Sequence, residues 1–185
     1  MKVIGIVGNN ADLSYNRLLL KQMAERYPNL EIEVAEIKAI PLFCEAATEQ
    51  LPAVVTALAA KIAAADGVII ATPEYDHTIP ACLKSTIEWL SCTVHPFTDK
   101  PVMIVGASLG PQGTSRAQGH LREILNSPGL GAHVLPGNEF LLNFAKQKFA
   151  SGAIVEQATL DFMDSCVAHF VNFIQVHTQV QTAIV

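Results

Sequence analysis

The chain has 185 residues, half of them hydrophobic, with only 16% charged and a formal net charge of −5. A chain of this length and apolar content can bury a core, so we expect one folded domain over residues 1–185 and no extended disorder. The 12 basic residues are outnumbered by 17 acidic ones and form no cluster, which argues against nucleic acid or an anionic membrane surface as a partner.

The first expected element is a strand at residues 2–7, an apolar run that ends at Gly8. The run is short and leads directly into patterned structure, so it is interpreted as a strand and not as a signal peptide. No later stretch approaches the roughly 20 apolar residues that a membrane-spanning helix needs. We therefore expect a cytoplasmic protein with no membrane partner.

Short β-branched runs then alternate with longer helical patterns. Further strands are expected at 31–37, 67–72, 101–107 and 132–135, and helices at 14–27, 52–65, 80–92, 115–126 and 156–176. For the tail at 177–185, a frayed end and a contact with a partner subunit are both left open.

This alternation predicts an α/β fold. The strands at 2–7, 67–72 and 101–107 are almost wholly apolar, as in a parallel sheet that helices cover on both faces. The strand at 31–37 alternates with Glu, which suits the edge of a sheet. Because crossovers between parallel strands are right-handed, the pattern favours a flavodoxin-like three-layer sandwich with a five-stranded parallel sheet in the order 2-1-3-4-5.

Ligands of such sheets bind beyond the carboxyl ends of the strands, where the strand order reverses, so the loops after Val7, Thr72 and Ala107 should form the site. In the first loop, Gly8 permits close backbone approach, and Ser14 is a natural N-cap for a helix whose free N–H groups suit a phosphate. Neutral donors come from Asn9, Asn10 and Asn16. The loop lacks the lysine of a nucleotide P-loop and the GxGxxG pattern of dinucleotide folds. A polar loop before a capped helix is the alternative.

The second loop contains Glu74, Tyr75, Asp76 and His77 between two prolines. A stiff loop of this kind can place an aromatic side chain against a planar ring, and Tyr75 is the natural contact. Turn formation and helix capping are the alternative for Glu74, Asp76 and His77.

The third loop combines Gly106, Ser108, Gly110 and Gly113, so its backbone can approach a ligand closely. Arg116, at the start of the following helix, can meet an anionic group of a second substrate. The alternative for Arg116 is a surface pair with Glu123 or with solvent.

Several other residues are expected to have structural roles. Trp89 is expected in the core or at a subunit contact, and Phe162, Phe170 and Phe173 in the core. The cysteines Cys44, Cys82, Cys92 and Cys166 form no CxxC pair and are expected to be buried and reduced. No histidines stand at metal-ligand spacing, so no metal site is expected. No GxSxG motif points to a hydrolase.

Three motifs in order resemble the NADPH-dependent FMN reductases of the flavodoxin-like superfamily, which include azoreductases, quinone reductases and chromate reductases. The first loop resembles the family pattern G-S-x-R-x-x-S-x-N, with Gly8, Ser14 and Asn16 in place, but Asn9 and Ala11 replace its Ser and Arg. The second motif is TPEYDHTIPACLKSTIEWLS, in which Asp76 replaces the usual Asn, and the third is SLGPQGTSRAQGHLREIL. The resemblance covers roughly residues 2–135.

The resemblance implies FMN as cofactor and NADPH or NADH as electron donor. It implies a small-molecule acceptor such as free flavin, a quinone, an azo compound or a metal oxyanion. It also implies a homodimer or homotetramer, with Trp89 suited to the contact. The implied cofactor-binding residues are Gly8, Asn9, Asn10, Ser14, Tyr15, Asn16, Pro73, Glu74, Tyr75, Asp76, Ser108, Leu109, Gly110, Gln112 and Gly113, and His77 and Arg116 are assigned to the second substrate. No side chain is required as acid or base, because the flavin carries the chemistry.

Two alternatives remain. The chain could be an FMN electron carrier like true flavodoxins, or an FMN-binding module that passes electrons or flavin to a partner oxidoreductase. A phosphoacceptor receiver domain needs an Asp pair after the first strand, where this chain has Gly8, Asn9 and Asn10, and it is set aside.

Overall fold

The computed structural model describes residues 1–184, and for residues 181–184 the backbone alone. Its main sheet has the parallel order β2-β1-β3-β4-β5, which confirms the predicted order, and a sixth strand, β6, also pairs with β4. The strands of this sheet are β1 (Lys2–Val7), β2 (Glu31–Glu36), β3 (Gly67–Ala71), β4 (Pro101–Ala107), β5 (His133–Val134) and β6 (Phe140–Leu142).

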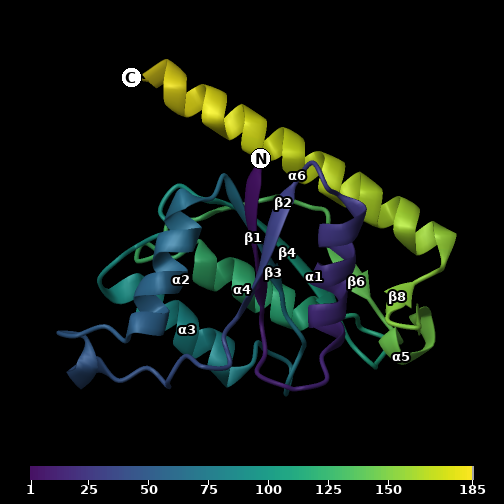
Figure 1. The fold of residues 1–185 in the computed structure, drawn as a ribbon, viewed down its shortest axis with the longest axis horizontal. Coiled ribbons are helices and arrows are strands. Elements are labelled where there is room, and N and C mark those ends of the chain that lie inside the picture. Colours follow the sequence, from purple (N-terminus) through teal and green to yellow (C-terminus); the bar gives the residue numbers. More distant parts are fainter. Residues whose placement is uncertain (185) are drawn as a thin grey trace.

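Helices cover both faces of the sheet, and in Figure 1 α2 and α3 lie on one side of the strands and α1 on the other. The core is correspondingly divided into two apolar clusters, one between the sheet and α2, α3 and α4, the other between the sheet and α1 and α6. The helices are α1 (Tyr15–Arg26), α2 (Ala53–Ala64), α3 (Ala81–Cys92), α4 (Ser115–Leu125), α5 (Ala145–Lys148) and α6 (Gln157–Ile184), with a short 3-10 helix, η1, at Glu45–Ala47.

The strands follow the apolar pattern from which they were predicted. Every residue of β3 and β4 is buried, because helices pack on both sides of these central strands. In β2, Glu31, Glu33 and Glu36 are exposed while the residues between them are partly or fully buried, as expected at an edge.

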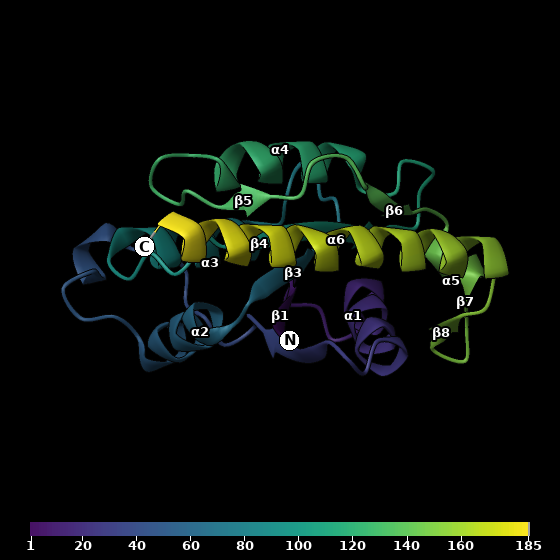
Figure 2. The same ribbon diagram turned by 90° about the horizontal axis from the view of Figure 1, so that it is seen from above.

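The last helix is longer than predicted. It continues through the tail as a helix to Ile184, and only Val185 lies outside the described residues. Figure 2 shows α6 crossing over the edge of the sheet where the strands begin, and Phe170 and Ile174 pack there against Gly67. Phe162, expected in the core, is 50% exposed, although its ring stacks on Phe140.

The fifth strand differs from the prediction of one segment at 132–135. It is split into β5 and β6, and between them Gly137 and Asn138 have positive φ angles, which interrupt regular strand geometry. β6 pairs with the carboxyl end of β4 and therefore borders the third loop. A small hairpin of β7 (Phe149–Ala150) and β8 (Ala153–Ile154), also not predicted, follows α5.

Trp89 belongs to the core of its own chain. It is 1% exposed, its indole N–H donates to the carbonyl oxygen of Pro41 at 2.9 Å, and Phe43 packs edge-on against it. These contacts leave no indole surface for a second subunit.

The expectation of four buried thiols holds only in part, because Cys44 and Cys92 are exposed, Cys82 is partly buried and Cys166 is buried. Among the described residues, no helix combines the length and apolar character needed to cross a bilayer.

Candidate functional site

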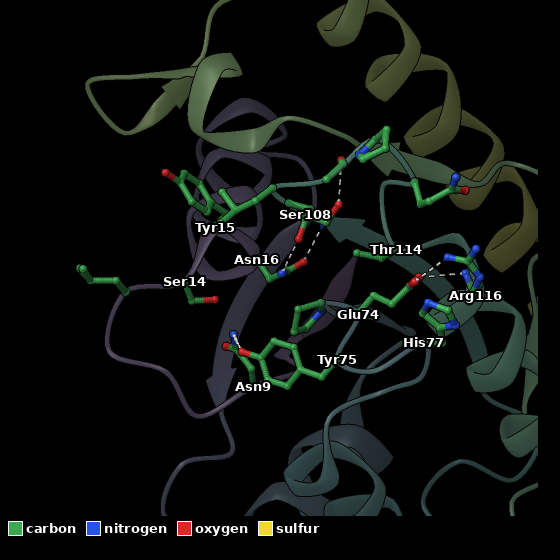
Figure 3. A pocket seen from close by; sticks show the side chains of 17 residues that line it. Asn9, Ser14, Tyr15, Asn16, Glu74, Tyr75, His77, Ser108, Thr114 and Arg116 are labelled. Atoms are coloured by element: carbon green, nitrogen blue, oxygen red, sulfur yellow. Dashed lines mark hydrogen bonds and ion pairs between the residues drawn. The ribbon is translucent and has the colours of Figure 1, made fainter.

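The loops after β1, β3 and β4 converge on one cavity of about 470 Å³ at the carboxyl edge of the sheet, as Figure 3 shows. This volume lies in the range of small-molecule and cofactor sites. Its lining residues come from all three loops and the starts of α1 and α4: Asn9, Leu13, Ser14, Tyr15, Asn16, Pro73, Glu74, Tyr75, His77, Ala107, Ser108, Leu109, Gly110, Pro111, Gln112, Thr114 and Arg116.

Most of the predicted site residues therefore line one cavity. Four of them, Gly8, Asn10, Asp76 and Gly113, lie outside its lining. Four lining residues, Leu13, Ala107, Pro111 and Thr114, are not among the assigned cofactor residues. Three of these are apolar, and an apolar residue in or beside a loop carries no local sign of a ligand.

Two of the predicted glycines serve packing between backbones. The N–H of Gly8 donates to the Ala71 carbonyl oxygen at 2.8 Å, and a Cβ on Gly8 would lie 2.7 Å from that oxygen. Gly113 has a φ of 59°, and a Cβ there would lie 2.8 Å from Leu141. In contrast, Gly110 has nothing within 4 Å of its Cβ position. Among Gly106, Gly110 and Gly113, only Gly110 has free space around its Cβ position.

The start of α1 forms one end of the cavity. Ser14 caps the helix as predicted, because its Oγ accepts from the Arg17 N–H at 3.2 Å. No described residue accepts a hydrogen bond from the backbone N–H groups of Tyr15 or Asn16. These free donors and the positive end of the helix dipole favour an anion.

Asn16 lines the cavity and also has a structural role that was not predicted. Its side-chain amide donates to the Ala107 carbonyl oxygen at 3.0 Å and accepts from the Ala107 N–H at 2.9 Å. Asn16 is 2% exposed, so this pair of buried bonds ties the start of α1 to the end of β4. These bonds use one of the two N–H groups of the amide, so one N–H is left for the donor role that was predicted toward a phosphate.

The outer side of the first loop carries a network of charges. The guanidinium of Arg17 donates to the carbonyl oxygens of Ala11 at 3.0 Å and Asp12 at 2.9 Å, and it is paired with Glu36. Lys38 in turn pairs with the Asp12 carboxylate. The bond to Lys38 lowers the pKa of Asp12, and the bond to Glu36 raises the pKa of Arg17. Both groups therefore stay charged at neutral pH.

Asn9 and Tyr75 meet across the cavity from the first and second loops (Figure 3). The Asn9 amide nitrogen lies 3.4 Å from the Tyr75 hydroxyl. Asn9 is 4% exposed, yet its Oδ1 has no hydrogen-bond partner among the described residues. A buried amide oxygen without a partner is costly, so this position suits a ligand that brings a hydrogen-bond donor. Tyr75 is 46% exposed and can contact a flat ring.

The second loop turns tightly between Tyr75 and Thr78. The backbones of these two residues exchange hydrogen bonds of 3.0 Å each, and the residues between them, Asp76 and His77, have φ angles of 47° and 66°. This two-residue turn with both φ angles positive is the kind that Asn-Gly adopts most readily. The turn directs His77 into the lining of the cavity and leaves Asp76 out of it.

Glu74 and Arg116 form a charged cluster at the end of the cavity opposite Ser14 and Tyr15 (Figure 3). Glu74 Oε2 accepts from the backbone N–H groups of Arg116 at 3.0 Å and Ala117 at 3.3 Å, so it caps α4. Glu74 Oε1 lies 3.3 Å from the Arg116 guanidinium. The partner of Arg116 is therefore Glu74, and not Glu123. Arg116 remains 45% exposed and can still meet an anionic group.

Behind the third loop, Thr114 is fully buried with a φ of 74°. Its Oγ1 accepts from the Gln118 amide at 3.1 Å, and the same amide donates to the Phe140 carbonyl oxygen. Position 106, which packs against Thr114, has room only for glycine, because a Cβ there would lie 1.9 Å from Thr114 Oγ1. This layer supports the third loop from below.

The thiol of Cys82 lies near the first loop, at the start of α3. Burial raises its pKa, against the effect of nearby backbone N–H groups that include that of Asn10. The thiol is therefore protonated at neutral pH and is no nucleophile. Across the described residues, no group of three or more His, Cys, Asp and Glu side chains could hold a metal.

A flavodoxin-like sheet whose strand-end loops enclose one cavity, with free helix N–H groups at one end and a half-exposed tyrosine in the wall, is the arrangement expected of a flavin-dependent oxidoreductase. Residues 1–147 match the model of the NADPH-dependent FMN reductases, and the chain belongs to this family. It is thus an FMN-dependent NAD(P)H oxidoreductase.

Several proteins are similar over nearly the whole chain. The NADH:(hydroxy)cinnamate reductase subunit CrdA of Vibrio ruber is 48% identical, over 97% of this chain and 90% of its own length. The NADH-dependent flavin reductase subunit 2 of Lactobacillus johnsonii is 47% identical, over 95% and 98%. The solved structure of FerB, a flavoenzyme NAD(P)H:(acceptor) oxidoreductase from Paracoccus denitrificans, has a TM-score of 0.86 at 25% identity and covers 95% of this chain and 98% of its own.

Proposed function

We propose that the cavity at the carboxyl edge of the sheet holds FMN, with the phosphate at the start of α1 and the ring beside Tyr75. The observation that carries this proposal is the convergence of three strand-end loops on one cavity, with unpaired helix N–H groups at one end and a half-exposed tyrosine in its wall. The buried Asn9 Oδ1, which lacks a partner among the described residues, is a fitting acceptor for a hydroxyl of the cofactor. When bound, FMN accepts hydride from the nicotinamide and returns the electrons to an acceptor.

The side chains bind and orient. Ser14 and the first N–H groups of α1 would hold the phosphate, and the backbone of Ser108 to Gln112 would border the ring. Tyr75 and the exposed Leu109 would shield the ring from water. His77 and Arg116 receive an anionic group of the nicotinamide or of the acceptor. Gly8, Asn10, Asp76 and Gly113 shape the loops without touching the cofactor.

We take the acceptor to be a small molecule with a flat redox-active ring, such as free flavin or a quinone, or else an azo compound or a metal oxyanion. A cavity of about 470 Å³ whose lining includes the exposed Leu13 and Leu109 and the half-exposed Tyr75 favours the flat rings. We also propose that residues 1–185 form a single domain, that the protein acts in the cytoplasm, where reduced nicotinamides are abundant, and that it assembles as a homodimer or homotetramer.

Purified protein tests the function directly. We expect it to bind FMN at micromolar concentrations and to show the flavin absorbance bleaching when NADH or NADPH is added without oxygen. Steady oxidation of the nicotinamide should then follow on adding a quinone or free flavin. A chain that takes up no FMN, or whose bound FMN is not reduced by either nicotinamide, would refute the proposal.

A second candidate is a donor module that supplies reduced flavin or electrons to a partner oxidoreductase. The relatives from Vibrio ruber and Lactobacillus johnsonii favour it, because both are named as subunits. An apoflavoprotein added as a trap separates the two functions. A donor module transfers FMN to the trap within a few turnovers and reduces quinones slowly, whereas a self-sufficient reductase keeps its FMN and turns over quinones alone.

A further inference from the structure

Arg17 lies in the first turn of α1 and faces the outer side of the first loop. Its guanidinium donates to two loop carbonyl oxygens, those of Ala11 and Asp12, and forks onto the carboxylate of Glu36 at the end of β2. The side chain is only 16% exposed. All of its partners lie away from the cavity, since neither Arg17 nor Ala11 nor Asp12 belongs to the lining.

This arrangement decides which backbone groups of the loop are available to a phosphate. A carbonyl oxygen turned toward the cavity would repel an anion, whereas an N–H group would bind it. By holding the carbonyls of Ala11 and Asp12 on the outer side, Arg17 leaves the N–H groups of Tyr15 and Asn16 as the free backbone donors at the start of α1. Arg suits this role better than Lys, because its planar fork can reach two carbonyls and a carboxylate together.

The first loop itself contains no basic residue. Ala11 stands where the resemblance places an arginine, and Asp12 beside it adds a negative charge that Lys38 compensates. The cation that is fixed closest to the loop backbone is therefore Arg17. It is anchored by Glu36 in β2, so that the loop, the helix and the edge strand form one unit.

We propose that Arg17 is the positioning residue of the phosphate end, and that it sets the preference for a phosphorylated flavin by fixing the first loop from behind. The inference rests on the proposed function, in which the FMN phosphate lies at the start of α1. Arg17 touches no cofactor atom in this account. Its effect is transmitted through the carbonyls of Ala11 and Asp12.

Binding of FMN compared with riboflavin tests the inference, because the two differ only in the phosphate. The measurement is the Kd of each, from quenching of flavin fluorescence. In Arg17→Met, the preference for FMN over riboflavin should fall by about tenfold or more, as expected when a charged hydrogen-bonding group is lost, while the riboflavin Kd changes by less than about threefold.

The matched control is Arg26→Met. Arg26 lies on the same helix and forks onto a carboxylate in the same way, at Asp164 of α6, but it touches no part of the loop. This variant should keep the full preference for FMN. Arg17→Lys keeps the charge but not the planar shape, and it should behave like Arg17→Met, since a single ammonium nitrogen with three N–H groups cannot replace the four hydrogen bonds that the guanidinium makes from three nitrogens.

The outcomes separate the two claims. If the wild-type protein binds riboflavin as tightly as FMN, the phosphate does not bind at the first loop. That result would overturn both the proposed position of the phosphate and the role of Arg17. A wild-type preference that survives in Arg17→Met, or that Arg17→Lys retains in full, would overturn the inference alone. A loss of riboflavin binding equal to the loss of FMN binding, or an equal loss in Arg26→Met, would show a general structural role and also overturn it.

Discussion

The two sides of the cavity are held in shape by different means. On the side of α1, side chains form hydrogen bonds with the backbone. Asn16 bonds with the N–H and the carbonyl of Ala107, and Arg17 donates to the carbonyl oxygens of Ala11 and Asp12. On the side of the second and third loops, the backbone is shaped by close packing and by left-handed residues, among them Asp76, His77 and Thr114. Each side can be loosened separately by substitution.

The difference has a functional meaning. In the proposed function the α1 side presents N–H groups to a phosphate that does not change during the reaction, and hydrogen bonds fix such donors well. In the proposed function the other side borders two successive flat molecules, and there the tight turn of the second loop and the close contact of Gly106 with Thr114 give a wall that is held by packing. Substitutions that break the packed side should therefore cost more stability than those that break the hydrogen-bonded side.

The largest effect is expected for Gly106→Ala, which attacks the packed side. The new Cβ would lie 1.9 Å from Thr114 Oγ1 and 2.6 Å from the Thr72 carbonyl oxygen. Neither neighbour can move easily, so we expect a loss of about 3 kcal/mol or more in the free energy of unfolding. Urea denaturation measures it. Gly110→Ala is the control, since it meets nothing within 4 Å and should change the free energy by less than about 0.5 kcal/mol. Equal effects of the two would contradict the packing argument.

Asn16→Ala removes the two hydrogen bonds that join the start of α1 to the end of β4, and thus the two sides of the cavity. The variant leaves the N–H and the carbonyl of Ala107 without partners in a buried place, so we expect a loss of about 2–3 kcal/mol, measured by urea denaturation. Asn10→Ala, at an exposed asparagine of the same loop, is the matched control and should be nearly silent. If Asn16 and Asn10 prove equally tolerant, the bonds of Asn16 to Ala107 do not stabilise the fold.

A smaller effect is expected for Glu74→Ala at the charged end of the cavity. Glu74 caps α4 through two backbone N–H groups and is 11% exposed, so its loss should cost about 1–2 kcal/mol. Glu123→Ala tests the partner that the sequence had suggested for Arg116, and this exposed residue should have almost no effect on the melting temperature. A larger loss in Glu123→Ala than in Glu74→Ala would reverse the assignment.

These sites also show what the sequence could predict. The sheet order, the buried central strands and the Ser14 cap follow from periodicity and local spacing, and each is confirmed. The bonds of Asn16 to Ala107, 91 residues away, and of Glu74 to Arg116, 42 residues away, join residues that no local pattern relates. The strand β6 was not predicted, because its three residues are too few to show an alternation of apolar and polar side chains.

The smallest effect, and the one of opposite sign, is expected at the turn of the second loop. His77 has a φ of 66°, a conformation that costs an L side chain free energy and glycine almost none. His77→Gly should therefore stabilise the protein by up to about 1 kcal/mol, or raise the melting temperature by roughly 2–4 °C for a chain of this size.

The control for this turn is His77→Ala, which removes the same imidazole but keeps a Cβ, so it should bring no gain in melting temperature. A gain in both variants would mean that the imidazole itself destabilises the loop, and a gain in neither would mean that the turn stores no strain. If the gain is confined to glycine and the KM for the nicotinamide rises in both variants, the strained backbone is kept because it directs the His77 side chain into the cavity.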